Sequence, residues 1–228
     1  ARTLDPLGNL YVSGTITDSL TAKDYFTIKY DPDGNELWTA RYNGPGNSDD
    51  LVTAIASDDL GFVYVTGWSV RAGPWGDYTT IKYDPNGNVV WIAYYNGPGN
   101  DSDIPSAITT DLLGNVYVTG LSEGLGTSMD YATIKYNSFG TEEWVARYHG
   151  FGNPDMAQDI TLDGAGNIYV TGWSDNYPSI DFVTIKYNPS GIEQWLTRYH
   201  PPSYTDTWVE AISFTWGNVY VTGTSGGD

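Results

Sequence analysis

The sequence predicts an all-β protein built from repeats, and three regularities support this prediction. The motif Tyr-Val-(Thr/Ser)-Gly occurs five times, at steps of 53, 53, 52 and 51 residues, starting at Tyr11, Tyr64, Tyr117, Tyr169 and Tyr220. A second motif, Asp-aromatic-X-Thr-Ile-Lys-Tyr, starts at Asp24, Asp77, Asp130 and Asp181. A tryptophan follows its last tyrosine by eight residues each time, at Trp38, Trp91, Trp144 and Trp195. A period near fifty residues indicates one supersecondary unit copied in tandem.

Each unit is expected to hold four strands, here called a to d. In the second unit, β-branched and aromatic runs at 51–57, 62–66, 78–83 and 88–95 are separated by turn signals. Strands of this length with tight turns are typical of a four-stranded antiparallel meander. No segment combines helical periodicity with start and stop signals, so no helix is expected.

The turns between a and b and between c and d share one pattern, with Asp or Asn first and Gly fourth. Asp or Asn accepts backbone N–H bonds two residues on, and Gly adopts the positive φ that closes the hairpin. The a–b turns begin at Asp5, Asp58, Asp111 and Asp163, and the c–d turns at Asp31, Asp84, Asn137 and Asn188.

Both faces of such a sheet are apolar, which predicts how the units pack. In strand c of the second unit, Tyr78 and Ile81 point to opposite faces and both are bulky. Radial stacking buries both faces of every sheet between its neighbours, with the repeated Trp as filling between sheets. We therefore predict a single β-propeller array over residues 1–228. Its blades are expected at about 1–46, 47–99, 100–152 and 153–202, followed by a half-blade at 203–228.

The repeats resemble the bacterial SBBP family of seven-bladed β-propeller repeats. The resemblance rests on the segments Gly114–Gly120, Asp77–Gly87 and Trp38–Gly46 and covers essentially the whole chain. It implies a β-propeller, typically in secreted or surface-exposed proteins, and it implies no reaction. Because the last unit has only strands a and b, we expect the ring to be completed by further blades, either from the same protein or from a second copy.

Composition limits the partners and the chemistry. The formal net charge is −18 with only ten Lys and Arg, so nucleic acid is not expected as a partner. No apolar run approaches the eighteen residues that a membrane helix needs, so no membrane insertion is expected. Cysteine is absent, which excludes disulfides, thiolate nucleophiles and Cys-bound metals. Acidity of this degree suits a secreted or cell-surface protein.

The variable b–c stretches are the first candidate binding site, because variable loops on a rigid scaffold commonly carry function. Four aromatic residues in or beside them are candidates for stacking on a glycan or a peptide: Trp68, Trp75, Trp173 and Tyr177. The alternative is that these side chains cap the core at the blade rim, which is the interpretation we favour.

The acidic d–a connections are the second candidate site. Asp50, Asp103, Asp155 and Asp206 lie a few residues before strand a. They could surround one mouth of the channel and bind a cation, with Ca²⁺ the expected ion because it takes carboxylate oxygens. The alternative, again favoured, is that each one caps a turn. Otherwise no cofactor is expected.

No catalytic constellation is found in the sequence. His149 and His200 occupy one repeat position at the end of strand d, and no serine has the surroundings of a hydrolase nucleophile. We therefore expect a non-enzymatic propeller module of an exported or cell-surface protein, acting in protein interaction or assembly. Two alternatives remain open: a carbohydrate-binding or carbohydrate-active propeller, and a subunit of an extracellular fibre or sheath extended through the open half-blade.

Overall fold

The computed structural model describes residues 1–17, 22–71, 73–151, 153–177, 179–200 and 207–225. The first blade contains β1 (Arg2–Leu4), β2 (Leu10–Thr17), β3 (Lys23–Tyr30) and β4 (Glu36–Tyr42). The second contains β5 (Asp50–Ser57), β6 (Val63–Val70), β7 (Gly76–Tyr83) and β8 (Val89–Tyr95). The third contains β9 (Asp103–Thr110), β10 (Val116–Glu123), β11 (Met129–Tyr136) and β12 (Glu142–Tyr148). The fourth contains β13 (Asp155–Leu162), β14 (Ile168–Asn176), β15 (Ser179–Tyr187) and β16 (Glu193–Tyr199), and β17 (Thr207–Thr215) and β18 (Asn218–Ser225) follow.

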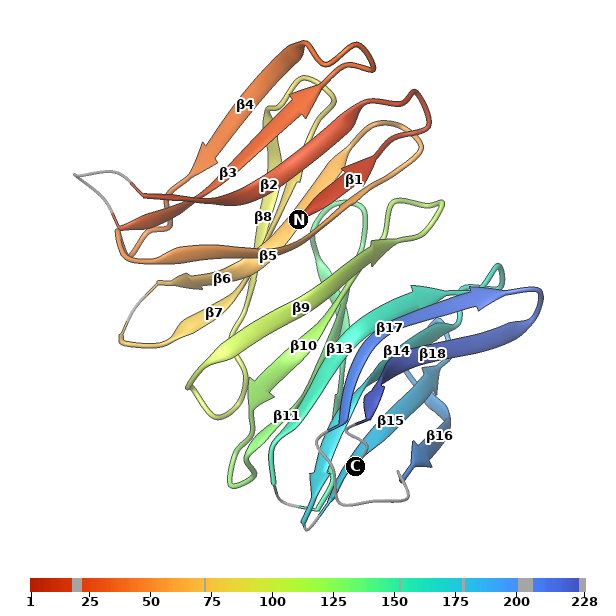
Figure 1. Ribbon diagram of the computed structural model, residues 1–228. Helices are drawn as coiled ribbons and strands as arrows, with labels where there is room; N and C mark the ends of the chain where they lie inside the picture. Colours follow the sequence, from red (N-terminus) through yellow and green to blue (C-terminus); the bar gives the residue numbers. More distant parts are fainter. Residues whose placement is uncertain (18–21, 72, 152, 178, 201–206, 226–228) are drawn as a thin grey trace.

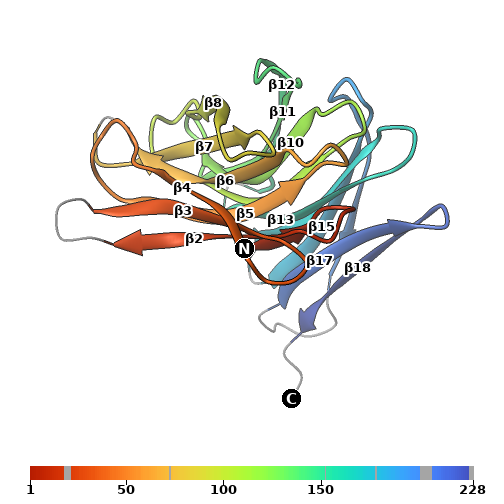
Figure 2. The ribbon, with the colours of Figure 1, turned by 90° about the horizontal axis from the view of Figure 1, so that it is seen from above.

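The prediction of a four-and-a-half-bladed all-β array is confirmed. Four sheets each hold four antiparallel strands in sequence order, β17 and β18 form a two-stranded sheet, and the described residues contain no helix. The a strands β5, β9, β13 and β17 lie beside one another along the centre, and the other strands spread outward (Figures 1 and 2). The sheets form an open fan in which the first blade and the half-blade lie at opposite ends.

The turns have the geometry that their sequences predict. In the c–d turn of the second blade, the carboxylate of Asp84 accepts the backbone N–H groups of Asn86 and Asn88 at 2.9 and 2.8 Å. Gly87 closes the turn with φ of 86°. Asp and Asn thus fix every such hairpin in the same way, and this explains why the blades are so similar.

The repeated Trp joins each blade to the next, as expected for a residue between sheets. Trp38 donates its indole N–H to the carbonyl of Pro85 at 3.0 Å, in the c–d turn of the following blade. Trp91 and Trp144 bond in the same way to Ser138 and Pro189, at 3.1 and 3.2 Å. Packing between blades is therefore directional, because a buried indole N–H needs an acceptor at one defined point of its neighbour.

The b strands are longer than expected, and this corrects the position of two candidate residues. Strands β6 and β14 continue past the motif glycine to Val70 and Asn176. Trp68 and Trp173 therefore lie within strands and not in the b–c loops. The a strands contain a register shift, for example between Val52 and Ala54, that the turn and strand signals did not reveal.

Candidate interaction sites

A row of polar side chains crosses each complete blade at the end where the b–c and d–a connections lie. In the third blade, Arg147 donates to the hydroxyl of Ser122 at 2.6 Å and to the carboxylate of Asp130 at 3.0 Å. Arg147 also donates to the hydroxyl of Tyr95 in the preceding blade at 2.8 Å. Arg198 repeats this arrangement with Asp181 and with Tyr148 of the third blade. The motif Asp therefore pairs with an arginine of strand d, a partner that the sequence patterns did not reveal.

Three of the four aspartates proposed for calcium, Asp50, Asp103 and Asp155, begin this row, and each of the three is fully buried. The backbone N–H of Gly44, Gly97 and Gly150 bonds Asp50, Asp103 and Asp155 at 2.6, 2.7 and 2.6 Å. Burial raises the pKa of Asp103 to about 6, although hydrogen bonds from Ser122 and the Gly97 amide lower it. Buried carboxylates held in this way stabilise the d–a connection.

The structure does not bring these aspartates together. Among the described residues, no group of three or more His, Cys, Asp or Glu side chains is placed to hold a metal ion. Asp206 lies outside the described residues. Calcium binding remains a prediction, without a preformed cage in this part of the chain.

The four aromatic candidates differ in their surroundings. Trp68 is half-buried against Gly76, and Trp173 packs edge-on against Trp208 of the half-blade. Tyr177 is 86% exposed and Trp75 is 48% exposed. The structure thus separates two aromatics that fill the packing from two that face the solvent.

The second blade departs from the repeat beside Trp75. Strand β8 carries Tyr94 where the other complete blades carry Arg41, Arg147 and Arg198. Arg71, from the b–c connection, replaces the missing guanidinium: it lies 3.9 Å from the centre of the Tyr94 ring and 3.6 Å from Asp77. The pocket beside this pair measures about 520 Å³ and is lined by Pro45, Arg71, Gly73, Pro74, Trp75, Asp77, Asn96, Asn100 and Asp101.

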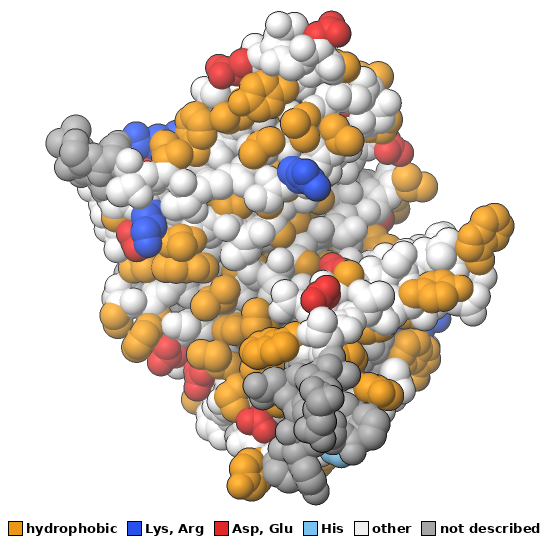
Figure 3. Space-filling model, viewed as in Figure 1, with side chains coloured by type: hydrophobic (Ala, Val, Ile, Leu, Met, Phe, Trp, Pro, Cys, Tyr) orange, Lys and Arg blue, Asp and Glu red, His pale blue; other side chains and the backbone are white. Residues whose placement is uncertain are grey.

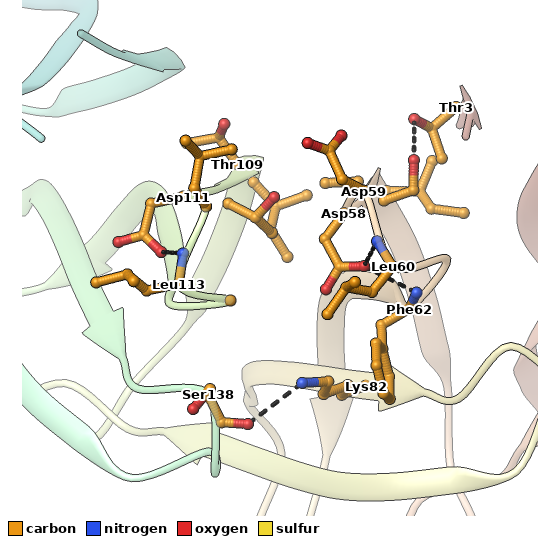
Figure 4. Close-up of a pocket in the computed structure, with 17 residues that line it drawn as sticks. Thr3, Asp58, Asp59, Leu60, Phe62, Lys82, Thr109, Asp111, Leu113 and Ser138 are labelled. Atoms are coloured by element: carbon orange, nitrogen blue, oxygen red, sulfur yellow. Dashed lines mark hydrogen bonds between the residues drawn. The ribbon is translucent and has the colours of Figure 1, made fainter. Parts of the chain in front are cut away.

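A second cavity of about 650 Å³ lies at the opposite end of the blades, between the a–b turns of the second and third blades. In Figure 4, Asp58 and Asp111 each accept backbone N–H bonds within their own turn. Lys82 extends to the carbonyl of Ser138 at 3.3 Å and lies 4.3 Å from the centre of the Phe62 ring. The cavity thus lies among the short, uniform turns of the blades and not among the variable b–c connections.

Phe62 is what distinguishes this cavity from its equivalents. The first, third and fourth blades carry Asn9, Asn115 and Asn167 at this position, and each amide bonds the turn aspartate. Burial lowers the pKa of Lys82, while the nearby charge of Asp58 raises it. The rim carries exposed Leu60, Leu112 and Leu113.

The outer face of the fourth blade is the third candidate site. Tyr199 is 57% exposed, whereas its equivalents Tyr42 and Tyr95 are 8% exposed. Phe182, Thr184, Thr197 and Tyr199 enclose about 560 Å³ together with Val221, Thr222 and Gly223 of β18. The half-blade covers the inner part of this face, where Phe214 stacks on Tyr169, and leaves the outer part open.

The small number of basic side chains on the surface agrees with the acidic composition of the chain. Figure 3 shows few Lys and Arg side chains on the face in view, separated from one another by apolar and neutral groups. Among the described residues, no helix has the length and apolar character needed to span a membrane.

Repeat alignment alone would have revealed two of the features that sequence reasoning missed. Tyr94 in place of Arg and Phe62 in place of Asn are visible as single departures from the repeat. Arg71 has no repeat position to compare with, because the b–c connections vary in sequence. Only the three-dimensional structure shows that its guanidinium reaches Asp77, the repeat aspartate of the second blade.

The geometry defines an open β-propeller of four complete antiparallel blades and half of a fifth. The SBBP β-propeller repeat model matches residues 37–69, 90–126 and 143–178. The chain therefore contains repeats of the SBBP β-propeller type.

Known relatives are much longer than this chain. Regulatory protein FlaEY of Caulobacter vibrioides is 32% identical over 108 residues, which are 47% of this chain and 10% of that protein. The uncharacterized WD repeat-containing protein L264 of Acanthamoeba polyphaga mimivirus is 25% identical over 170 residues, 67% of this chain and 11% of that protein. The chain thus spans about a tenth of the length of either relative. A solved structure described as a eukaryotic initiation factor aligns with TM-score 0.45 and 10% identity, covering 87% of this chain and 55% of that one.

Proposed function

We propose that this chain is a non-enzymatic β-propeller module of an exported or cell-surface protein and that it acts in protein interaction or assembly. One observation carries the proposal: the outer face of the fourth blade is open, whereas the equivalent faces of the three earlier blades are covered. A sheet face with exposed Trp195 and Tyr199, beside the strand edge of β18, favours association with further β-structure.

Sedimentation velocity over a wide range of protein concentration tests this proposal. We expect concentration-dependent association that Tyr199→Asp weakens, because a carboxylate on the open face must be desolvated on contact. Trp216→Asn is the matched control, since Trp216 is an exposed aromatic on the far turn of the half-blade. A chain that stays monomeric throughout, or whose association ignores Tyr199→Asp, contradicts assembly through this face. Electron microscopy of the associated material separates closed rings from fibres.

A second candidate function, carbohydrate binding, is favoured by the pocket at Trp75. An exposed indole beside the polar side chains of Asn96, Asn100 and Asp101 combines a flat apolar surface with hydrogen-bonding groups. A glycan array with the wild-type chain, Trp75→Ala and Trp216→Asn tests it. Binding that only Trp75→Ala removes supports this function, whereas an array without signal removes it. A hydrolysis screen on the same glycans tests whether turnover accompanies binding.

A further inference from the structure

The three complete interfaces between blades show what a c–d hairpin must provide to cover its neighbour. The carbonyl of the second turn residue accepts the Trp indole N–H of the preceding blade, as Ser138 does for Trp91 at 3.1 Å. The same carbonyl accepts the Lys82 ammonium at 3.3 Å. In the first two interfaces the turn therefore presents one oxygen to two donors of the preceding blade, whereas Lys135 of the third interface pairs with Glu143 instead.

The fourth turn residue must be glycine for two separate reasons. Gly87, Gly140 and Gly191 have φ of 86°, 82° and 77°, a region that favours glycine. A Cβ on any of them would lie 2.6–2.7 Å from the indole of the preceding blade. The turn backbone thus lies directly on the Trp ring, and a side chain there would separate the two blades.

The fourth blade carries the equivalent Trp and Lys, but within the described ranges no c–d hairpin covers them. Trp195 is 38% exposed, and its indole N–H has no hydrogen-bond acceptor among the residues that the structure describes. Lys186 lies over the Tyr169 ring at 5.1 Å, as Lys29 lies over Tyr11, but has no turn carbonyl beside it in the described part of the chain. Phe182, Thr184, Thr197 and Tyr199 line the uncovered space of about 560 Å³.

The first blade shows the complementary arrangement at the other end of the chain. Gly34 closes its c–d turn with φ of 85°, and a Cβ there would meet nothing within 4 Å. Its equivalents in the later blades all lie on a Trp. The contrast arises from position in the array, because the turn has the same geometry but no described residue packs on it.

We propose that the open face of the fourth blade is an acceptor site for a β-hairpin of the repeat's own c–d type, with a glycine as the fourth turn residue lying on Trp195. This inference rests on the proposed interaction function and names its partner. The occupant is a two-stranded hairpin because β17 and β18 already hold the places of strands a and b. The outer edge of β18 provides backbone groups for antiparallel pairing with the first strand of the hairpin.

A second copy of residues 1–228 can contact this face, but it cannot complete the blade unless it gives up part of a blade of its own. Its c and d strands are all paired within complete four-stranded sheets. A hairpin from a further repeat unit fits without such a rearrangement, and the great length of the relatives is consistent with further repeats.

The test uses a labelled synthetic peptide with the sequence Asp130–Tyr148, the c–d hairpin of the third blade, added to the chain at concentrations below its self-association. Fluorescence anisotropy measures binding. The control peptide carries Gly140→Val, which keeps the length and every other residue but blocks approach to the indole. The chain variants are Trp195→Ala, at the proposed contact, and Leu7→Asn, in the exposed a–b turn of the first blade and away from it.

We expect saturable binding of the wild-type peptide, weakened about tenfold or more by Gly140→Val or by Trp195→Ala and unchanged by Leu7→Asn. Hydrogen exchange should slow in β15, β16 and β18 of the complex. Absence of binding, or equal binding of both peptides, overturns the inference. Because an isolated hairpin is marginally stable, a chain extended at its C-terminus by this segment is the second arm, and unchanged exchange at β15 and β16 in that chain also overturns it. If the chain still self-associates through Tyr199 while both arms fail, the hairpin is wrong and the proposed function stands.

Discussion

The guanidinium of Arg71 lies over the Tyr94 ring, 3.9 Å from its centre, and so occupies the place of the strand-d arginine that the second blade lacks. Its ion pair with Asp77 measures 3.6 Å, and both groups are partly exposed. Burial raises the pKa of Asp77, and the charge of Arg71 opposes that rise. A cation is thus retained beside this carboxylate although it comes from a different segment of the chain.

The first prediction concerns this replacement. Arg71→Ala should lower the free energy of unfolding by about 0.5–1 kcal/mol, the range for an exposed cation–π contact and surface ion pair. Adding Tyr94→Arg restores the arrangement of the third and fourth blades, so the double variant should be more stable than Arg71→Ala alone. Urea unfolding of wild type, both single variants and the double variant measures the coupling. Strict additivity of the two substitutions would show that Arg71 and Tyr94 do not act together.

The fold could be predicted from the sequence because the same signals occur four times. One Asp-X-X-Gly turn is weak evidence, but eight turns at a fixed spacing, joined by four Trp at one position, leave little freedom in how the strands pair. The direction of the contact between blades could not be predicted. Trp38 bonds to Pro85 and not within its own sheet, and a periodic pattern does not distinguish these two options.

The candidate sites were less predictable, for a reason that follows from the repeat itself. Reading the shared pattern emphasises what the blades have in common, whereas the pockets form where one blade differs. Phe62 and Tyr94 are single departures, and Arg71 acts through a connection without a repeat equivalent. Trp68 was expected in the b–c loop but lies within β6, because the end of a strand cannot be located closely from the position of a glycine.

The second prediction separates backbone strain from packing between blades. Gly34→Ala should cost about 1 kcal/mol, because alanine disfavours positive φ. Gly140→Ala carries the same strain and adds a Cβ 2.7 Å from Trp91, so it should cost roughly 2–4 kcal/mol. Urea unfolding of the two variants gives the difference directly. Equal losses would mean that the turn does not press on the indole.

The third prediction is a pH dependence caused by Asp103. Burial raises its pKa to about 6 in the folded protein, against about 3.9 in an unfolded chain. Between these values the folded state holds the extra proton, so this group makes the protein less stable as the pH rises from 4 to 6, by roughly 1–3 kcal/mol. Asp103→Asn should remove this loss, and the difference in unfolding free energy between wild type and variant should therefore change across that range and level off above it.

The opposite sign is expected for Asp163→Asn, which serves as the control. Burial alone would raise the pKa of Asp163, but hydrogen bonds from Asn167, Tyr169 and the turn backbone lower it overall. Its contribution to stability is present above the unfolded pKa and is lost as the pH falls through the folded one. Urea unfolding at a series of pH values should therefore show the wild type gaining on Asp163→Asn as the pH rises through about 4 and losing to Asp103→Asn. Parallel profiles for the two variants would show that burial of the Asp103 carboxylate does not control its protonation.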